Sequence, residues 1–380
     1  MTQAVSTQGT QGTHGIGTVP LDLITARRRV DAALAEFLEG KARAAAARPE
    51  QRESVGILRD FVLAGGKRIR ATLCVTGCHA AGGGAAEDLL PALVRVAAAL
   101  EMFHAFALIH DDVMDRSPTR RGRPTVHRRV AAQYGGRRGA DRLGESAAVL
   151  IGDLALVWSD ELLHTAGLSG ARLDAVLRVM DTMRADVMHG QYLDLIAAGR
   201  PTDDMQLALD IAHFKTTTYT VEHPLLLGAA LATAAADTPD TPGAEALRSA
   251  LTAYARPVGE AFQLRDDLLG AFGDPATTGK PVLDDFRDGK HTVLLALALR
   301  HADAGQARVL RALTGRPDLD DLGAARIRRV LRETGAPARV EAMIDDRLRR
   351  ALAVLDGAAL PAGAATALRE IAYAATARTA

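Results

Sequence analysis

The chain has 380 residues, 48% of them hydrophobic, which is enough apolar material for a large core. Its 46 basic and 46 acidic side chains cancel, so the formal net charge is zero. Because no basic surplus is left to neutralise a phosphate backbone, we expect no nucleic-acid partner.

Residues 1–20 are polar and rich in Gly, Thr and Gln, without the apolar stretch of a signal peptide. We therefore predict a disordered tail on a cytoplasmic protein that has no membrane span. Over residues 21–380 the dominant residues are good helix formers, and apolar side chains recur at helical spacing. Prolines fall mostly between these stretches. We predict a single all-α domain, a large helical bundle around a central active-site cavity.

Only five of the 46 basic residues are lysines, and four of these lie in the segments GGKR, FKTT, TGKP and DGKH, which contain Gly or Thr. A compact ammonium group is a common phosphate ligand. In the first of these segments, Lys67 and Arg70 follow a pair of glycines where an apolar helix is predicted to begin. Two cations beside the free N–H groups of a helix N-terminus attract an anion.

Three aspartates, Asp111, Asp112 and Asp115, follow an apolar helical run. Asp111 and Asp115 are one turn apart on the same helix face, where their carboxylates repel each other. Mg²⁺, which prefers oxygen donors, would relieve this repulsion, whereas in isolation the cluster could also be a solvated acidic helix end. His104 lies two turns before Asp111 on roughly the same face, so we consider it a candidate donor to a phosphate oxygen.

Arg120 and Arg121 come shortly after this cluster, in a loop rich in Pro and Gly. Metal-binding acids next to paired guanidinium groups are typical of a diphosphate site. Farther along the chain, Lys215 and Thr216 lie in an apolar helical segment, which makes them candidate donors to a leaving diphosphate.

A second acidic cluster consists of Gln263, Asp266 and Asp267, which share a helix face at spacings of three and four. The loop after it is rich in Asp and Gly and contains Lys280 and Lys290. This composition suits phosphate and metal, although a charged surface loop remains an alternative for Asp284–Asp288.

Together these segments resemble the all-trans polyprenyl diphosphate synthase family, closest to the geranylgeranyl and farnesyl diphosphate synthases. The resemblance runs from about Gly65 to about Leu295 and rests on segments that follow one another in the family's order. They are GGKRIR, EMFHAFALIHDDVMDRSPTRRGRPTVH, IGD at 151–153, GQYLDL at 190–195, FKTT, and FQLRDDLLGAFGDPATTGKP.

The resemblance implies a Mg²⁺-dependent condensation of isopentenyl diphosphate with an allylic diphosphate, in a homodimer. Asp111, Asp115 and Asp266 would hold Mg²⁺ against the allylic diphosphate, assisted by Asp112 and Asp267. The residues that would grip that diphosphate are Arg120, Lys215, Thr216, Gln263, Lys280 and Lys290. The residues that would hold isopentenyl diphosphate are Lys67, Arg70, His104 and Arg121.

Two further expectations concern details of the motifs. In members of the family, the residues just before the first acidic motif limit the length of the product chain. In this sequence these positions hold one aromatic residue, Phe106, and one small residue, Ala107. This pair resembles geranylgeranyl synthases, so we expect a C20 product. The second motif often ends in Asp, but here that position is Gly270, which puts the binding of a third metal ion in question.

Three alternatives remain open. A class I terpene cyclase would need the first acidic cluster but no isopentenyl diphosphate site, so the set of Lys67, Arg70, His104 and Arg121 argues against it. A non-catalytic subunit of a heteromeric synthase would be expected to have lost ligands that this chain retains. A helical scaffold with incidental acids does not explain the placement of the lysines.

Overall fold

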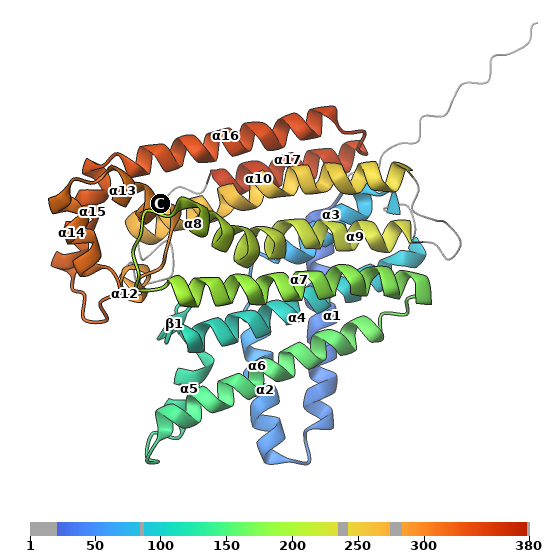
Figure 1. Ribbon diagram of the computed structural model, residues 1–380. Coiled ribbons are helices and arrows are strands. Elements are labelled where there is room, and N and C mark those ends of the chain that lie inside the picture. Colours follow the sequence, from blue (N-terminus) through green and yellow to red (C-terminus); the bar gives the residue numbers. More distant parts are fainter. Residues whose placement is uncertain (1–20, 84–86, 235–241, 274–282, 378–380) are drawn as a thin grey trace, which may run out of the picture.

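The computed structural model describes residues 21–83, 87–234, 242–273 and 283–377. Apart from two short strands, the regular elements of these ranges are helices, which confirms the predicted all-α class (Figure 1). The predicted tail and Lys280 lie outside the described residues.

The first part of the described chain holds the helices that surround the first acidic cluster. Its elements are α1 (Leu23–Ala44), α2 (Pro49–Leu63), α3 (Ile69–Ala80), η2 (Glu87–Leu89), α4 (Leu90–Met114), β1 (Thr119–Arg120), β2 (Arg123–Pro124), α5 (Val126–Gln133), α6 (Ala140–His164) and α7 (Gly170–Ala197).

The second part holds α8 (Met205–Ile211), the π-helix η3 (Ala212–Glu222), α9 (His223–Thr233), α10 (Pro242–Phe272), α12 (Asp284–Asp288), α13 (Val293–His301), α14 (Ala304–Leu313), α15 (Asp321–Glu333), α16 (Ala336–Gly357) and α17 (Ala362–Thr376).

Helix α4 is the centre of the larger core cluster and packs against α1, α3 and α6. Among the described helices it is the one long and apolar enough to cross a bilayer, but 72% of its most apolar window is buried inside the protein. A helix that is apolar on all sides belongs in a protein interior or in a membrane. Because most of this window is buried inside the protein, we interpret α4 as a core helix. The core thereby fixes the position of Asp111, in the last turn of α4.

Beyond α4 the chain makes a small antiparallel hairpin, in which Thr119 pairs with Pro124 and Arg120 with Arg123. The hairpin brings Arg120 back towards the end of α4. Arg121 and Gly122 adopt the left-handed conformation at its tip, with φ of 53° and 71°. The sequence predicted a loop here, and the turn explains how Arg120 reaches Asp111 and Asp112, whereas Arg121 donates to the carbonyl of Gly65.

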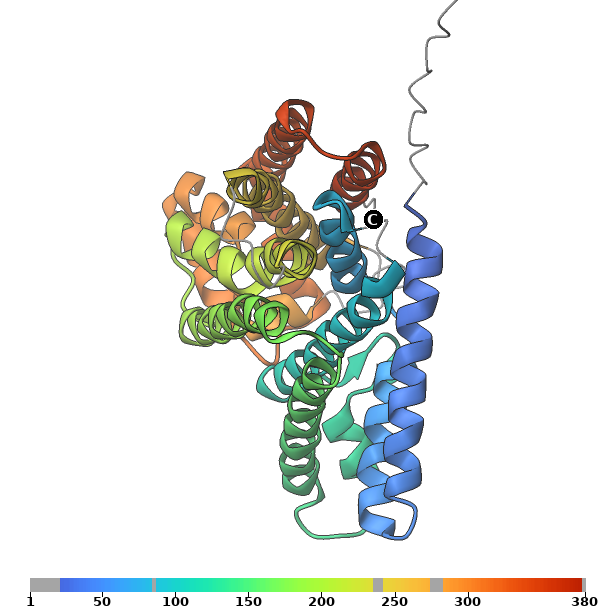
Figure 2. The same cartoon turned by 90° about the vertical axis from the view of Figure 1, so that its right-hand side faces the viewer.

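The second acidic cluster lies near the end of α10, which packs against η3, α16 and α17. Contrary to the tendency of prolines to separate helices, Pro257 lies inside α10. Ala377, directly after α17, lines one cavity together with residues of α8 and α12. Figure 2 shows α1 as a long helix along one side and α16 and α17 at one end.

Candidate active site

A cavity of about 730 Å³ opens between the two acidic clusters. Ten of the residues predicted from the sequence line it: Lys67, Asp111, Asp115, Arg120, Lys215, Thr216, Gln263, Asp266, Asp267 and Lys290. Residues separated by more than two hundred positions, such as Lys67 and Lys290, thus meet at one place, as the sequence interpretation requires.

Both acidic clusters lie where a helix ends. Asp111 is in the last turn of α4, Asp115 caps that helix, and Asp266 and Asp267 are close to the end of α10. The C-terminal end of a helix carries partial negative charge from unpaired carbonyl groups. The negative charge of carboxylates at this end of a helix is destabilising unless cations lie nearby, so positively charged groups in the cavity stabilise the site.

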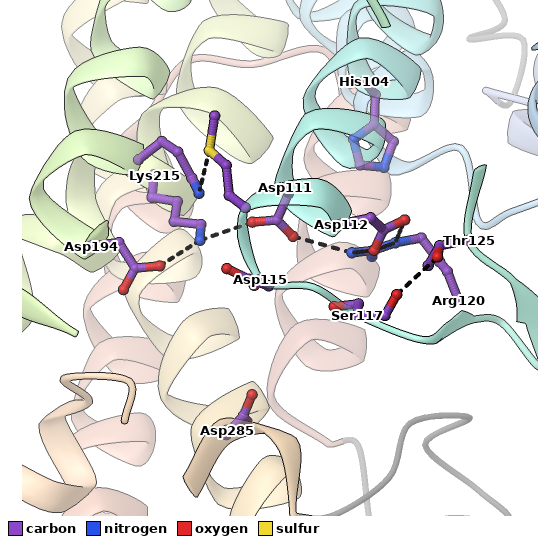
Figure 3. Close-up of polar contacts among 12 residues, drawn as sticks. His104, Asp111, Asp112, Asp115, Ser117, Arg120, Thr125, Asp194, Lys215 and Asp285 are labelled. Carbon is purple, nitrogen blue, oxygen red and sulfur yellow. Dashed lines mark hydrogen bonds and ion pairs between the residues drawn. The ribbon is translucent and has the colours of Figure 1, made fainter. Parts of the chain in front are cut away.

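Lys215 is one of these positively charged groups. Its Nζ lies 2.6 Å from Oδ2 of Asp194 on α7 and 3.2 Å from Oδ1 of Asp111 (Figure 3). Burial acts against the charge of Lys215, but Asp111 and Asp194 outweigh it and raise the pKa of its ammonium group. Burial alone would raise the pKa of Asp111, yet Lys215 and Lys290 hold it below its ordinary value. Both groups are therefore charged at neutral pH.

Lys290 makes the equivalent bridge on the other side of the cavity. Its Nζ lies 3.1 Å from Oδ2 of Asp115 and 3.7 Å from Oδ1 of Asp285 in α12. Burial opposes its charge, but Asp285 and Asp115 raise the pKa of Lys290 well above the ordinary range. The two lysines thus connect the end of α4 with α7 and with α12.

Arg120 and Asp112 form a buried ion pair beside the cavity. Both carboxylate oxygens of Asp112 accept from the Arg120 guanidinium at 2.8 and 2.9 Å, and Asp111 accepts from the same guanidinium at 3.1 Å. The Asp112 side chain is 1% exposed, whereas Asp111 and Asp115 line the cavity. The structure therefore places Asp112 against Arg120 and Asp111 at the cavity surface.

On the α10 side, hydrogen bonds connect the predicted residues in a row. Thr216 donates to Gln263 at 2.6 Å, and the Gln263 amide donates to Asp267 at 2.8 Å. Burial raises the pKa of Asp267 to about 7. Asp266 lines the cavity beside it.

Of the four residues expected to hold isopentenyl diphosphate, Lys67 lines this cavity. His104 Nδ1 lies 2.8 Å from the Tyr219 hydroxyl, and the Arg70 guanidinium stacks 4.0 Å from the centre of the Tyr219 ring. Arg121 donates to the carbonyl of Gly65. Burial, together with Arg70 and Arg121, lowers the pKa of His104 well below its usual value. A neutral imidazole among arginines is the arrangement expected where an anion binds.

Phe106 and Ala107 lie on α4, about one turn before Asp111. The Phe106 ring is 9% exposed and packs 4.6 Å from the His110 ring and 5.2 Å from the Phe103 ring, centre to centre. Ala107 is half-buried against the same core cluster.

Three residues of the site have no role in the sequence interpretation. Asp194 belongs to the segment GQYLDL, one of the segments that carry the family resemblance, and Asp285 belongs to the charged loop after the second acidic cluster. Tyr219 comes four residues after Lys215 and had no signal apart from helical spacing from it.

The lining of the cavity suits a divalent cation that prefers oxygen. Eight aspartates line it, and Mg²⁺ takes carboxylate oxygens together with water and phosphate oxygens. In the described part of the chain no three Asp, Glu, His or Cys side chains converge as metal ligands do. Instead the ammonium groups of Lys215 and Lys290 lie between the acids.

Comparisons with known proteins agree with this geometry. Residues 52–329 match the family model described as polyprenyl synthetase. The chain is 33% identical over 264 residues to the short chain isoprenyl diphosphate synthase of Methanocaldococcus jannaschii, which covers 69% of this chain and 71% of that protein. It is also 33% identical over 244 residues to the (2E,6E)-farnesyl diphosphate synthase of Mycobacterium bovis, covering 64% of this chain and 60% of that protein.

Among solved structures, the geranylgeranyl pyrophosphate synthase of Corynebacterium glutamicum, complexed with isoprenyl diphosphate and magnesium, is similar with a TM-score of 0.88 and 40% identity. The match covers 94% of this chain and 100% of that one. The names of these relatives differ in the product they specify.

Proposed function

Since this chain belongs to the polyprenyl synthetase family and is a trans-prenyltransferase, we propose that it condenses isopentenyl diphosphate with an allylic diphosphate and that its main product is geranylgeranyl diphosphate. The observation that carries this proposal is one cavity in which two acidic helix ends face Lys215 and Lys290, beside a cluster of arginines around His104.

The first step that the residues must support is ionisation of the allylic C–O bond. Mg²⁺ held by Asp111, Asp115 and Asp266 would act as a Lewis acid on the leaving diphosphate. Lys215, Lys290 and Arg120 line the same cavity and supply fixed positive charge where negative charge develops. Lys280, which lies outside the described residues, is proposed to join them.

We assign Asp112 a positioning role. Its two hydrogen bonds to Arg120 fix the plane of the guanidinium group, so that a free N–H edge can meet a phosphate oxygen. Gln263 and Thr216 would likewise orient Asp267 and the diphosphate, through the hydrogen bonds that already join them.

The second substrate would be held by Lys67, Arg70, His104 and Arg121. A neutral His104 can donate a hydrogen bond from one ring nitrogen, and the Tyr219 hydroxyl contacts the other. Charge from the arginines would bind the isopentenyl diphosphate and leave its double bond facing the allylic carbon. The cavity is also lined by the apolar side chains of Leu108, Ile211 and Ala212. These side chains would keep water from the allylic carbocation that forms when the diphosphate leaves.

Product length is proposed to depend on Phe106. Its ring is buried and held between the rings of Phe103 and His110, so it cannot easily rotate aside for a longer chain. Ala107 leaves space beside it. A C20 chain is the product that we infer from this pair.

We also propose that the protein is a cytoplasmic homodimer. Large apolar side chains are exposed along α6 and α7, among them Leu150 at 68%, Val157 at 59% and Tyr192 at 61%. Apolar surface of this extent is typical of an interaction site. Light scattering should give the mass of two chains, and Leu150→Glu with Tyr192→Glu should give the mass of one; a monomeric wild type would contradict the proposal.

The test of function is an incubation with Mg²⁺, isopentenyl diphosphate and, in separate reactions, dimethylallyl, geranyl or farnesyl diphosphate, with chain length read by mass spectrometry. We expect elongation that stops at C20. Consumption of the allylic substrate without isopentenyl diphosphate would indicate a terpene cyclase instead. Inactivity with every primer, rescued by a second protein, would indicate a non-catalytic subunit.

A further inference from the structure

The second acidic motif lacks its last carboxylate, because position 270 is Gly. Gly270 lies inside helix α10. Glycine destabilises a helix interior, so its presence at this position calls for a structural explanation. A Cβ built on Gly270 would lie 3.2 Å from Cγ of Asp285 and closer still to Oδ2 of that residue, inside the 3.0 Å that real Cβ atoms essentially never cross. The space that a side chain at position 270 would fill is therefore taken by the carboxylate of Asp285.

Asp285 reaches this place from a separate element, the first turn of α12. Its carboxylate lines the same cavity as Asp266 and Asp267. Figure 3 shows the Asp285 side chain pointing towards the part of the cavity that holds Asp115. Lys290 joins the two, at 3.7 Å from Asp285 and 3.1 Å from Asp115.

We propose that Asp285 supplies the carboxylate that the second motif lacks, so that Asp266 and Asp285 together bind the cation on the α10 side of the cavity. This inference rests on the proposed diphosphate chemistry. Gly270 then leaves the space that this position of Asp285 uses, because a Cβ at residue 270 would push the Asp285 carboxylate away from α10.

A counterintuitive consequence follows for Gly270→Asp, the substitution that restores the more common family pattern. The new side chain would compete with Asp285 for one space and bring two carboxylates into contact, so cation affinity should fall. Combining Gly270→Asp with Asp285→Ala frees that space and should recover affinity. If Asp285 had no part in cation binding, adding Asp285→Ala would not restore the affinity that Gly270→Asp lowers, so the double variant tests the interaction between the two positions.

The experiment measures Mn²⁺ bound to the full chain in the presence of inorganic diphosphate, with free Mn²⁺ followed by electron paramagnetic resonance. Asp285→Asn and Gly270→Ala should each weaken Mn²⁺ binding by about 10–100-fold, the usual effect of disturbing groups around a metal. Gly270→Ala should fold well, since Ala is the better helix former. Asp174→Asn, an exposed position on α7 that does not line the cavity, is the matched control.

Wild-type affinity for Mn²⁺ in Asp285→Asn would overturn the proposal, as would a double variant no better than Gly270→Asp alone. The elongation assay on the wild type is a separate readout. If the wild type fails to elongate any primer, the proposed function fails, while the Mn²⁺ comparison still decides the role of Asp285.

Discussion

Gly190 sets the distance between α7 and the π-helix that carries Lys215. A Cβ at Gly190 would lie 2.6 Å from the carbonyl carbon of Phe214 and 2.7 Å from Cα of Lys215. These are backbone atoms, so no side chain can rotate to make room. Asp194, the partner of Lys215, lies one turn after Gly190 on the same helix face. We predict that Gly190→Ala damages activity through Lys215.

The size of the effect follows from the contact distances. Non-bonded carbon atoms are comfortable at about 3.5–4.0 Å, so the two helices must move apart by about 1 Å. Overpacking of this kind costs about 1–3 kcal/mol, and the better helix propensity of Ala returns up to about 1 kcal/mol. We expect a net loss of about 1–2 kcal/mol of folding stability. A displacement of about 1 Å in a positioned group can lower the rate about 100-fold.

Thermal unfolding and the rate of elongation test both parts of this prediction. Gly170→Ala is the matched control, because Gly170 begins the same helix and has no atom within 4 Å of its Cβ position. That variant should be as active as the wild type and at least as stable. If Gly190→Ala kept wild-type stability and rate, the close approach of α7 to η3 would have no role in placing Lys215.

Three further predictions concern other parts of the site. Phe106→Ala should shift the product beyond C20 by mass spectrometry, since it opens the packed ring layer; an unchanged product would show that the ring is no limit. The pKa of His104 lies well below the ordinary value of 6.5 in the folded chain. As the pH falls below about 6.5, His104 becomes protonated in the unfolded chain but stays neutral in the folded chain, and this difference favours unfolding. The wild type should therefore lose more stability between pH 7 and pH 5 than His104→Gln in urea titrations, and equal losses would contradict a neutral His104. Arg265 donates to Glu341 at 2.6 Å and to the carbonyl of Thr376 at 3.0 Å. Arg265→Met should therefore release the end of α17 near the cavity and raise KM, whereas an unchanged KM and melting temperature would refute that anchoring role.

The sequence predicted the parts of the site that depend on residue type and local spacing. Asp111 and Asp115 share a helix face at a spacing of four, and Lys290 follows a glycine in an acidic loop. Such patterns extend over only a few residues, so they can be recognised without knowledge of the tertiary structure. The all-α class was predicted in the same way, from composition and periodicity.

Contacts between distant elements could not be predicted in this way. The pairing of Lys215 with Asp194 joins α7 to a π-helix, and no local sequence pattern indicates that π-helix. The family resemblance implies that Asp112 assists in metal binding, and its partner Arg120 comes from a separate element. On a helix, adjacent residues point about 100° apart, and the hairpin brings Arg120 to the face on which Asp112 lies.

The lysines link metal binding to diphosphate binding. Lys215 and Lys290 are already paired with the carboxylates that are proposed to hold or surround Mg²⁺. A cation that binds alone must displace an ammonium group, and a diphosphate that binds alone is repelled by the eight aspartates that line the cavity. When both bind, each lysine can turn from an aspartate to a phosphate oxygen, and no charge is left without a partner. The two ligands should therefore bind cooperatively, with a coupling of about 1–3 kcal/mol.

A thermal shift experiment tests this coupling without any turnover, because a ligand of the folded state raises the melting temperature. We expect little stabilisation by Mg²⁺ alone or by inorganic diphosphate alone, and a rise larger than the sum of the two when both are present. Lys215→Met should reduce this excess, since it removes the group that changes partners. Strictly additive shifts in the wild type would mean that the acids bind Mg²⁺ without displacing the lysines, and the exchange of partners would be wrong.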